Sequence, residues 1–155
     1  MKTIELTRGY VALVDDEDFD RVNAHKWHVH FKSVGARPYA QHSYRENGVN
    51  HTIDMHRFIL DSEIEVDHKD HNGLNCQRYN LRKATESQNQ HNQPLRKNNT
   101  SGHKGVSWKK DAGKWQVRVM CDRKHIYIGM FTEYNVACEA ADAAMLKYHG
   151  EYACV

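Results

Sequence analysis

The chain has 155 residues, of which 27% are charged, with a mean hydropathy of -0.85 and a formal net charge of +2. This length suits one compact domain or two small ones, and the lack of any run of 18 apolar residues excludes a membrane-spanning helix. The segment Met1–Glu5 lacks the basic-then-apolar pattern of a secretory signal, so we expect a cytoplasmic protein.

The cysteines give no sign of a structural metal or of a disulfide scaffold. They are widely spaced, and no Cys-x-x-Cys pair occurs among Cys76, Cys121, Cys138 and Cys154. We therefore expect four reduced thiols.

Basic residues are concentrated in the C-terminal part of the chain. Between residues 96 and 124, nine Lys and Arg residues stand against Asp111 and Asp122. A local basic surface on a nearly neutral chain indicates a polyanionic partner, and a solvated face explains the same composition about equally well.

A polar segment divides the sequence into two modules. Residues 94–102 contain Pro94, one of only two prolines, and no aromatic residue, which is typical of a surface linker. We place the modules at residues 1–93 and 103–155.

The first module opens with runs that are β-prone or alternate in polarity. These runs are Tyr10–Val14, Trp27–Phe31, Tyr39–Tyr44 and Val49–Ile53. Asn47-Gly48 predicts a hairpin between the last two, and the acidic stretch Asp15–Asp20 predicts a turn or short helix. Met55–Leu60 could begin a helix. The module is therefore expected to be a small sheet with short helices.

The second module has a clearer pattern. Three short strands are predicted at Gly105–Lys109, Lys114–Met120 and His125–Gly129. An alanine-rich helix follows, with Thr132 as its N-cap and Gly150 as its stop. The whole chain is thus expected to be α+β, with a C-terminal three-stranded antiparallel sheet packed on one helix.

The residues between Val66 and Asn92 suit the hydrolysis of a phosphodiester. His68 can activate water because an imidazole titrates near neutrality. Asp67 and Asn89 supply oxygen ligands, which suit magnesium better than zinc. Adjacent strand residues point to opposite faces, so Asp67 and His68 serve one site only if the backbone bends or the substrate approaches edge-on. Thr85 is expected to cap a short helix that carries Asn89. A plain polar loop remains open as the alternative for this segment.

Several segments of this region together resemble the HNH endonucleases of phages and mobile introns. The matching segments are Met55–Leu60, Val66–Asn75, Tyr79–Thr85 and Ser87–Asn89. The resemblance implies a ββα-metal motif, in which a strand, a loop and a helix surround one divalent cation, Mg²⁺ or Mn²⁺.

The resemblance also implies roles for individual residues. His68 corresponds to the general base, Asp67 and Asn89 to the metal ligands, and Asn80 to the residue that braces the loop and orients the histidine. The second histidine of the family name has no counterpart at the metal position, where Asn89 stands as in one branch of the family. For His56, packing and a phosphate contact are equally open.

The second module is similar to the plant APETALA and ethylene-response-factor DNA-binding domain. The matching segments are Ser101–Trp108, Gly113–Trp115, Tyr127–Phe131, Ala137–Ala144 and Tyr148–Ala153. The resemblance implies that the sheet enters the major groove of double-stranded DNA. The expected DNA contacts are Lys104, Ser107, Lys109, Gln116, Arg118, His125 and Tyr127.

The sequence therefore predicts a two-module, site-directed DNA endonuclease of the homing type, in the host cell of a phage or mobile element. One site per chain predicts nicking by a monomer, whereas double-strand cleavage requires a dimer or a strand switch. Two alternatives stay open. One is a DNA-binding regulator with an inactive nuclease site, and the other is a structural zinc protein, which the lack of cysteine pairs disfavours.

Overall fold

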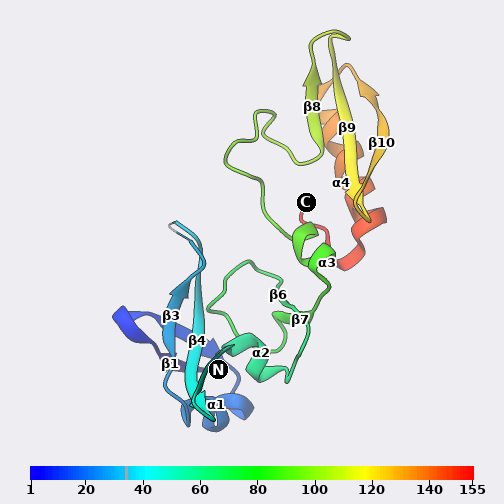
Figure 1. Cartoon of the computed structure of the whole chain (residues 1–155). Coiled ribbons are helices and arrows are strands. Elements are labelled where there is room, and N and C mark those ends of the chain that lie inside the picture. The colour runs from blue at the N-terminus through cyan, green and yellow to red at the C-terminus, as the bar shows by residue number, and fades with distance from the viewer. Residues whose placement is uncertain (34) are drawn as a thin grey trace. The chain divides into compact units, whose positions relative to one another are not determined.

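The structure is a computed structural model that describes residues 1–33 and 35–155. It is a mixed α+β fold of small antiparallel sheets and short helices, arranged in two compact units, Met1–Thr85 and Glu86–Val155 (Figure 1). No helix in the described part of the chain is long and apolar enough to cross a membrane.

The first unit holds seven strands. In chain order its elements are β1 (Lys2–Glu5), η1 (Thr7–Gly9), β2 (Val11–Val14), α1 (Asp16–Asn23), β3 (His28–Phe31), β4 (Pro38–Glu46), β5 (Val49–Asp54), α2 (Met55–Ile59), β6 (Val66–His68) and β7 (Leu81–Lys83). They form three antiparallel sheets, β1-β2, β3-β4-β5 and β6-β7. The strands β1 and β7 were not expected from the sequence, because three or four residues show no clear alternation.

Local chemistry explains the longest hairpin of this unit. Asn47 and Gly48 both have positive φ, 50° and 80°, as the tight turn between β4 and β5 requires. The predicted hairpin is therefore confirmed. Behind it, Val14, Val22, Met55 and Ile59 are fully buried and join the sheets to α1 and α2 in one core.

The second unit contains the predicted sheet on a helix. Its elements are α3 (Glu86–His91), β8 (Val106–Lys109), β9 (Lys114–Cys121), β10 (Lys124–Phe131), α4 (Tyr134–His149) and η2 (Gly150–Tyr152). The strand order is β10-β9-β8, and α4 covers one face of the sheet (Figure 1). Val117 and Val119 of β9 pack on the small residues Ala137, Ala141 and Ala144 of α4.

The ends of α4 agree only in part with the sequence. Gly150, with φ of 56°, follows its last residue as predicted. The N-cap is Glu133 rather than Thr132, and it makes no side-chain capping bond. The start of α4 therefore has no side-chain cap, and Tyr134 and Ala137 near this end belong to the core between α4 and the sheet.

The division between the units also differs from the predicted linker. Residues 94–102 lie inside the second unit, which begins at Glu86. The side chain of Asn99 accepts hydrogen bonds from the amides of Ser101 and Gly102, at 3.0 and 2.7 Å. The Tyr134 hydroxyl donates to the Ser101 carbonyl at 2.8 Å. Polar residues that looked like a free linker therefore fold this segment onto its own unit.

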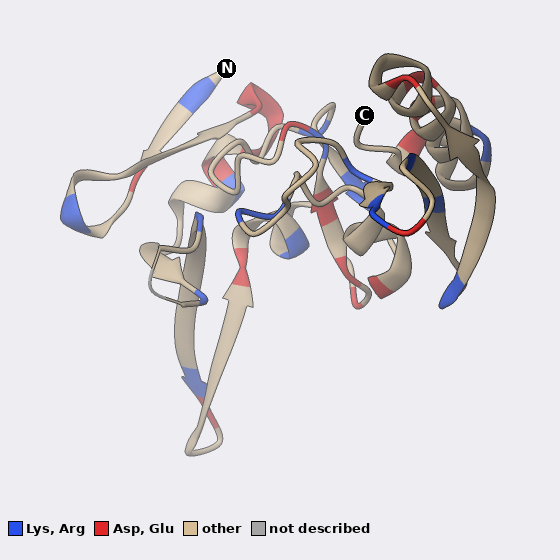
Figure 2. Ribbon diagram, turned by 90° about the horizontal axis from the view of Figure 1, so that it is seen from above, with Lys and Arg blue, Asp and Glu red and all other residues tan. Residues whose placement is uncertain are grey.

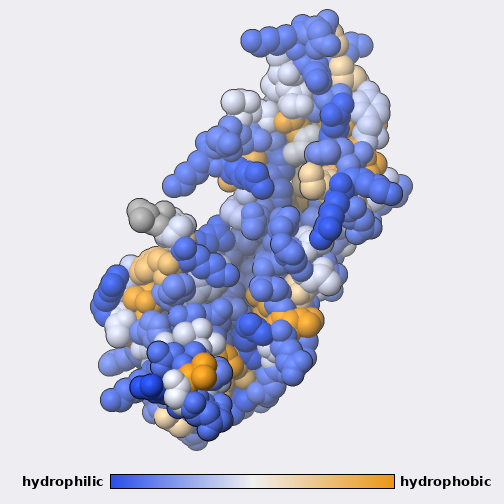
Figure 3. Space-filling view, viewed as in Figure 1, coloured by the Kyte–Doolittle hydropathy of each residue, from blue (hydrophilic) through white to orange (hydrophobic). Residues whose placement is uncertain are grey.

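Exposed apolar residues are scattered. On the face shown in Figure 3, apolar side chains form small separate groups among hydrophilic ones. Such scattered exposure is ordinary for a protein surface.

Candidate active site

Asp67 lies at the centre of β6 and is ion-paired. It stands opposite Arg82 of β7, whose Nη2 and Nε lie 2.7 and 2.9 Å from Asp67 Oδ2. Asp67 is only 5% exposed. A positive charge therefore already lies on the carboxylate that was predicted to hold the cation.

His68, the next residue of β6, has a different set of neighbours. Its ring centroid lies 4.8 Å from that of His56 and 5.9 Å from that of Tyr39. The Cys76 Sγ lies 4.0 Å from His68 Nε2. Adjacent strand residues point to opposite faces, and Asp67 and His68 follow that rule in their contacts.

The loop between β6 and β7 is braced by Asn80. Asn80 Nδ2 donates to Asp70 Oδ1 at 2.9 Å and to the Asn75 carbonyl at 2.8 Å. Its Oδ1 accepts the Asp70 amide at 3.0 Å, and Asn75 Nδ2 donates to Asp70 Oδ2 at 2.7 Å. Asn80 is 1% exposed and its bond to the Asn75 carbonyl is buried, whereas Asp70 is exposed and its bonds are part-buried. Asn80 therefore holds the β6–β7 loop in place through these hydrogen bonds. Its predicted role in orienting His68 stays a prediction.

The same loop is tied to the acidic start of α1. Arg78 donates through Nε and Nη2 to the two carboxylate oxygens of Asp18, both at 2.7 Å. The Arg78 amide and the Gln77 side chain both bond to Asp15. The acidic stretch that the sequence marked as a turn or short helix therefore also anchors the loop between β6 and β7. The run of carboxylates was visible in the sequence, but no sequence pattern predicted that Arg78 would pair with it.

The loop packs closely on the neighbouring sheet at Gly73. A Cβ at this position would lie 2.4 Å from the Pro38 carbonyl oxygen and 2.8 Å from the Tyr39 ring. Only glycine fits there, and Tyr39 in turn contacts the rings of both His56 and His68.

Burial decides the protonation of the two histidines. Burial lowers the pKa of His56 to about 3, helped by the positive charges of Lys32 and Arg57. Burial and the neighbouring His56 lower the pKa of His68 to about 3, against the opposing effect of Asp70, Asp67 and Asp54. Both rings are therefore neutral near pH 7.

The pKa values of Asp70 and Cys76 are shifted in directions that suit groups with a structural role. Burial opposes the charge of Asp70, but hydrogen bonds from the Asn72 amide and from Asn75 and Asn80 outweigh it and lower its pKa. Burial raises the pKa of the Cys76 thiol far above its ordinary value, so it stays protonated.

The buried histidines predict acid sensitivity. In the unfolded chain each ring has a pKa near 6.5, against about 3 when folded. The unfolded state binds more protons below pH 6.5, so stability is lost as the pH falls from about 6.5 towards 3. The loss is at most about 1.4 kcal/mol per pH unit for each ring. Urea unfolding at pH 7 and pH 4.5 measures this loss, and we expect His56→Phe to remove part of it.

An exposed histidine supplies the control for this experiment. His51 lies on β5 and is exposed, so His51→Phe should leave the pH dependence as in the wild type. Equal acid sensitivity of the His56→Phe variant and the wild type would contradict the assignment of this effect to His56.

Asn89, the other predicted metal ligand, lies on α3 and is half-buried. This helix belongs to the second unit, where the ring of His91 stacks on that of His149 with centroids 3.8 Å apart. The role of Asn89 stays a prediction. In the described part of the chain, no group of three or more His, Cys, Asp or Glu side chains is arranged to hold a metal ion.

The chemistry of the expected donors fits a hard divalent cation. One carboxylate and one amide oxygen leave most of the coordination shell to water and phosphate, which is usual for magnesium. A cation at Asp67 would share this carboxylate with Arg82, so the ion pair is the feature of the site that opposes metal binding.

The predicted DNA contacts lie mainly on the outer face of the second unit's sheet. The pairings Ser107 with Gln116 and Arg118 with Tyr127 put these side chains on the face away from α4. Arg118, Tyr127 and His125 are exposed. Figure 2 marks in blue the Lys and Arg residues of these strands. The positions suit DNA contact, and the contact itself is a prediction.

Two of these residues are less suited than expected. Gln116 is only 7% exposed, because it lies on the central strand between Ser107 and Met130. Lys104 precedes β8, and its Nζ donates to the carbonyls of His91 and Gln93 at 3.0 and 2.7 Å. Burial lowers the pKa of Lys104. Its ammonium group thus caps the end of α3, off the outer face of the sheet.

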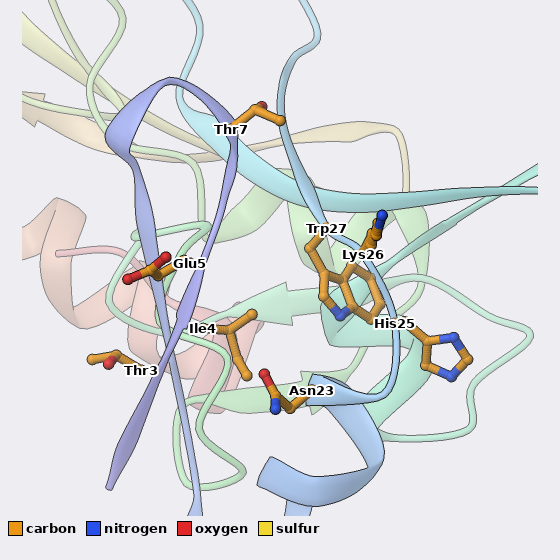
Figure 4. A pocket seen from close by; sticks show the side chains of 8 residues that line it. All are labelled: Thr3, Ile4, Glu5, Thr7, Asn23, His25, Lys26 and Trp27. Atoms are coloured by element: carbon orange, nitrogen blue, oxygen red, sulfur yellow. The ribbon is translucent and has the colours of Figure 1, made fainter.

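The first unit also has a hollow of about 530 Å³ on its surface. Figure 4 shows its lining, which is Thr3, Ile4, Glu5, Thr7, Asn23, His25, Lys26 and Trp27. It shares no residue with the predicted active site.

Comparison with known proteins finds a relative in a phage. Over 59 residues the chain is 42% identical to Protein 3.8 of Escherichia phage T7. The match covers 38% of this chain and 49% of the T7 protein, so the chain spans about half the length of this relative. No protein-family model matches the chain, and no solved structure matches it. The chain is thus similar to a phage protein over part of its length.

Proposed function

We propose that this protein is a metal-dependent DNA endonuclease of the HNH type, from a phage or mobile element, whose second unit binds duplex DNA. The observation that carries the proposal is the β6–loop–β7 segment. It holds Asp67 and His68 as neighbours on one short strand, so a substrate that approaches edge-on would meet both, and it braces the following loop through Asn80. The partial similarity to a phage protein supports the proposed origin.

The chain's own residues supply the proton chemistry. His68 would take a proton from the attacking water, whose oxygen forms a bond to phosphorus. Burial keeps the ring neutral near pH 7 and, by lowering its pKa to about 3, makes it a weaker base than an exposed imidazole. The phosphorus–oxygen bond to the leaving group breaks on the opposite side. Asp67 would hold a divalent cation, which when bound would neutralise charge on the phosphate and the leaving oxygen. A single site per chain nicks one strand as a monomer.

A second function is favoured by a specific observation. The Asp67 carboxylate is paired with Arg82, and His68 is only 5% exposed. A DNA-binding regulator with an inactive nuclease site would keep both features without cost to its function.

Incubation of the wild-type protein with supercoiled DNA from its own genome separates the two functions. The endonuclease nicks the DNA with Mg²⁺ or Mn²⁺ and not with a chelator. A protein that retards this DNA in a gel but nicks it under neither condition is the regulator. Nicking that is equally fast in excess chelator would overturn the metal-dependent mechanism.

The outer face of the sheet predicts a salt-dependent contact. We expect Arg118→Ala to weaken DNA binding about 10-fold and to reduce the slope of log K against log salt by about 1, because one cation leaves the interface. Fluorescence anisotropy over a salt series measures both quantities.

Two lysines serve as matched comparisons. Lys147 is exposed on α4, which covers the other face of the sheet, so Lys147→Ala should bind DNA like the wild type. Lys104→Ala should lower the stability of the second unit and leave the salt slope unchanged. If Lys147→Ala and Arg118→Ala weaken binding equally, the outer face is not the interface.

A further inference from the structure

His56 is a buried histidine beside the proposed catalytic base, and the proposed mechanism does not use it. It lies on α2, is 5% exposed, and has its ring at 77° to the ring of His68 with centroids 4.8 Å apart. Tyr39 contacts both rings, so the three rings form one closed cluster.

The polar atoms of His56 are poorly matched to a packing role. Its Nε2 lies 3.8 Å from Asp54 Oδ2, beyond hydrogen-bond distance, and its Nδ1 is buried without a hydrogen-bond partner. Burying such an atom unpaired costs free energy, which an apolar residue of similar shape would avoid. Groups that lower stability in this way are often retained for function.

The surroundings also indicate which tautomer His56 adopts. The carboxylate of Asp54 favours a proton on the nearer nitrogen, Nε2. That leaves Nδ1 as a buried acceptor without a hydrogen-bond partner, on a ring that lies edge-on to the ring of His68. A base must hold its own proton on one nitrogen and present the other to water, so a polar neighbour that biases this choice affects the rate.

We propose that His56 is a positioning residue that sets the ring orientation and the tautomer of His68. This inference rests on the proposed nuclease function of the same site. It assigns His56 no contact with the substrate: His56 acts on His68 through the edge-on ring contact, and the charge of Asp54 acts on His56.

Two substitutions separate the polar role of His56 from its packing role. His56→Phe keeps an aromatic ring and removes both nitrogens, whereas His56→Asn keeps a polar atom close to the position of Nδ1. We expect His56→Phe to lower kcat for nicking about 10–100-fold with KM changed less than twofold. Its melting temperature should equal or exceed that of the wild type. His56→Asn should recover part of the lost rate, and His51→Phe should match the wild type.

A spectroscopic measurement tests the positioning without the nuclease reaction. Side-chain ¹H–¹⁵N spectra report the tautomer of each histidine, and the signals of His68 are identified by their loss in His68→Gln. The His68 nitrogen shifts should change in His56→Phe and stay unchanged in His51→Phe.

The outcomes are distinct for the two proposals. Unchanged His68 shifts in His56→Phe, or a kcat equal to that of the wild type, would overturn the role of His56. A wild-type protein that does not nick would overturn the proposed function, and the nitrogen shifts then decide the positioning role by themselves.

Discussion

Replacing His68 with alanine is expected to lower the rate of Mg²⁺-dependent nicking by about 10²–10⁴-fold, because the attacking water loses the group that takes its proton. DNA binding should not change, since the residues expected to bind DNA lie in the second unit. Plasmid nicking gives the rate, and gel retardation of the same DNA gives the affinity.

The His68→Ala experiment needs a control for folding, because His68 is buried and its replacement can destabilise the first unit. His68→Gln retains more of the side-chain volume than alanine and should be as inactive. His51→Ala, on an exposed position of the same unit, should nick like the wild type. Circular dichroism must show both His68 variants folded. A folded His68→Ala protein that nicks at the wild-type rate would remove His68 from the mechanism.

Replacing Asn80 with alanine is expected to destabilise the first unit by about 2–4 kcal/mol. The substitution leaves the buried Asn75 carbonyl without its partner, which costs about 1–3 kcal/mol, and removes two part-buried hydrogen bonds to Asp70, worth about 0.5–1.5 kcal/mol each. Nicking should fall as well, since the loop that follows His68 loses its brace.

The measurement should report on the first unit alone. Trp27 is the one tryptophan of this unit, and Trp108 and Trp115 belong to the second. In a Trp108→Phe, Trp115→Phe background, urea unfolding followed by fluorescence therefore reads the first unit. Asn50→Ala, at an exposed position of β5, is the matched control. If both variants unfold at the same urea concentration, the Asn80 network does not hold the loop.

Much of the fold was readable from the sequence because its signals are local. The Asn47-Gly48 turn and the alternation along β9 each lie within a few residues, and they predicted the hairpin and the C-terminal sheet. The alanine-rich segment after the last strand likewise predicted the helix that packs on that sheet. Short strands such as β7 escaped detection, because three residues carry no period and pair only with a distant segment.

Some features of the candidate site were likewise visible in the sequence, and others were not. The types and spacing of Asp67, His68 and Asn80 were visible in the sequence, since chemistry resides in the side chains themselves. Their neighbours were not, because burial and pairing depend on segments that are far apart along the chain.

Only the tertiary structure showed that Arg82 pairs with Asp67, that Arg78 ties the loop to Asp18, and that His56 lies against His68. It likewise showed that the Lys104 ammonium group donates to the carbonyls of His91 and Gln93, while its DNA contact stays a prediction. The sequence by itself determined which groups are available for catalysis. The folded chain decided which charges meet and which rings are held neutral, because both depend on distance and on exclusion of water.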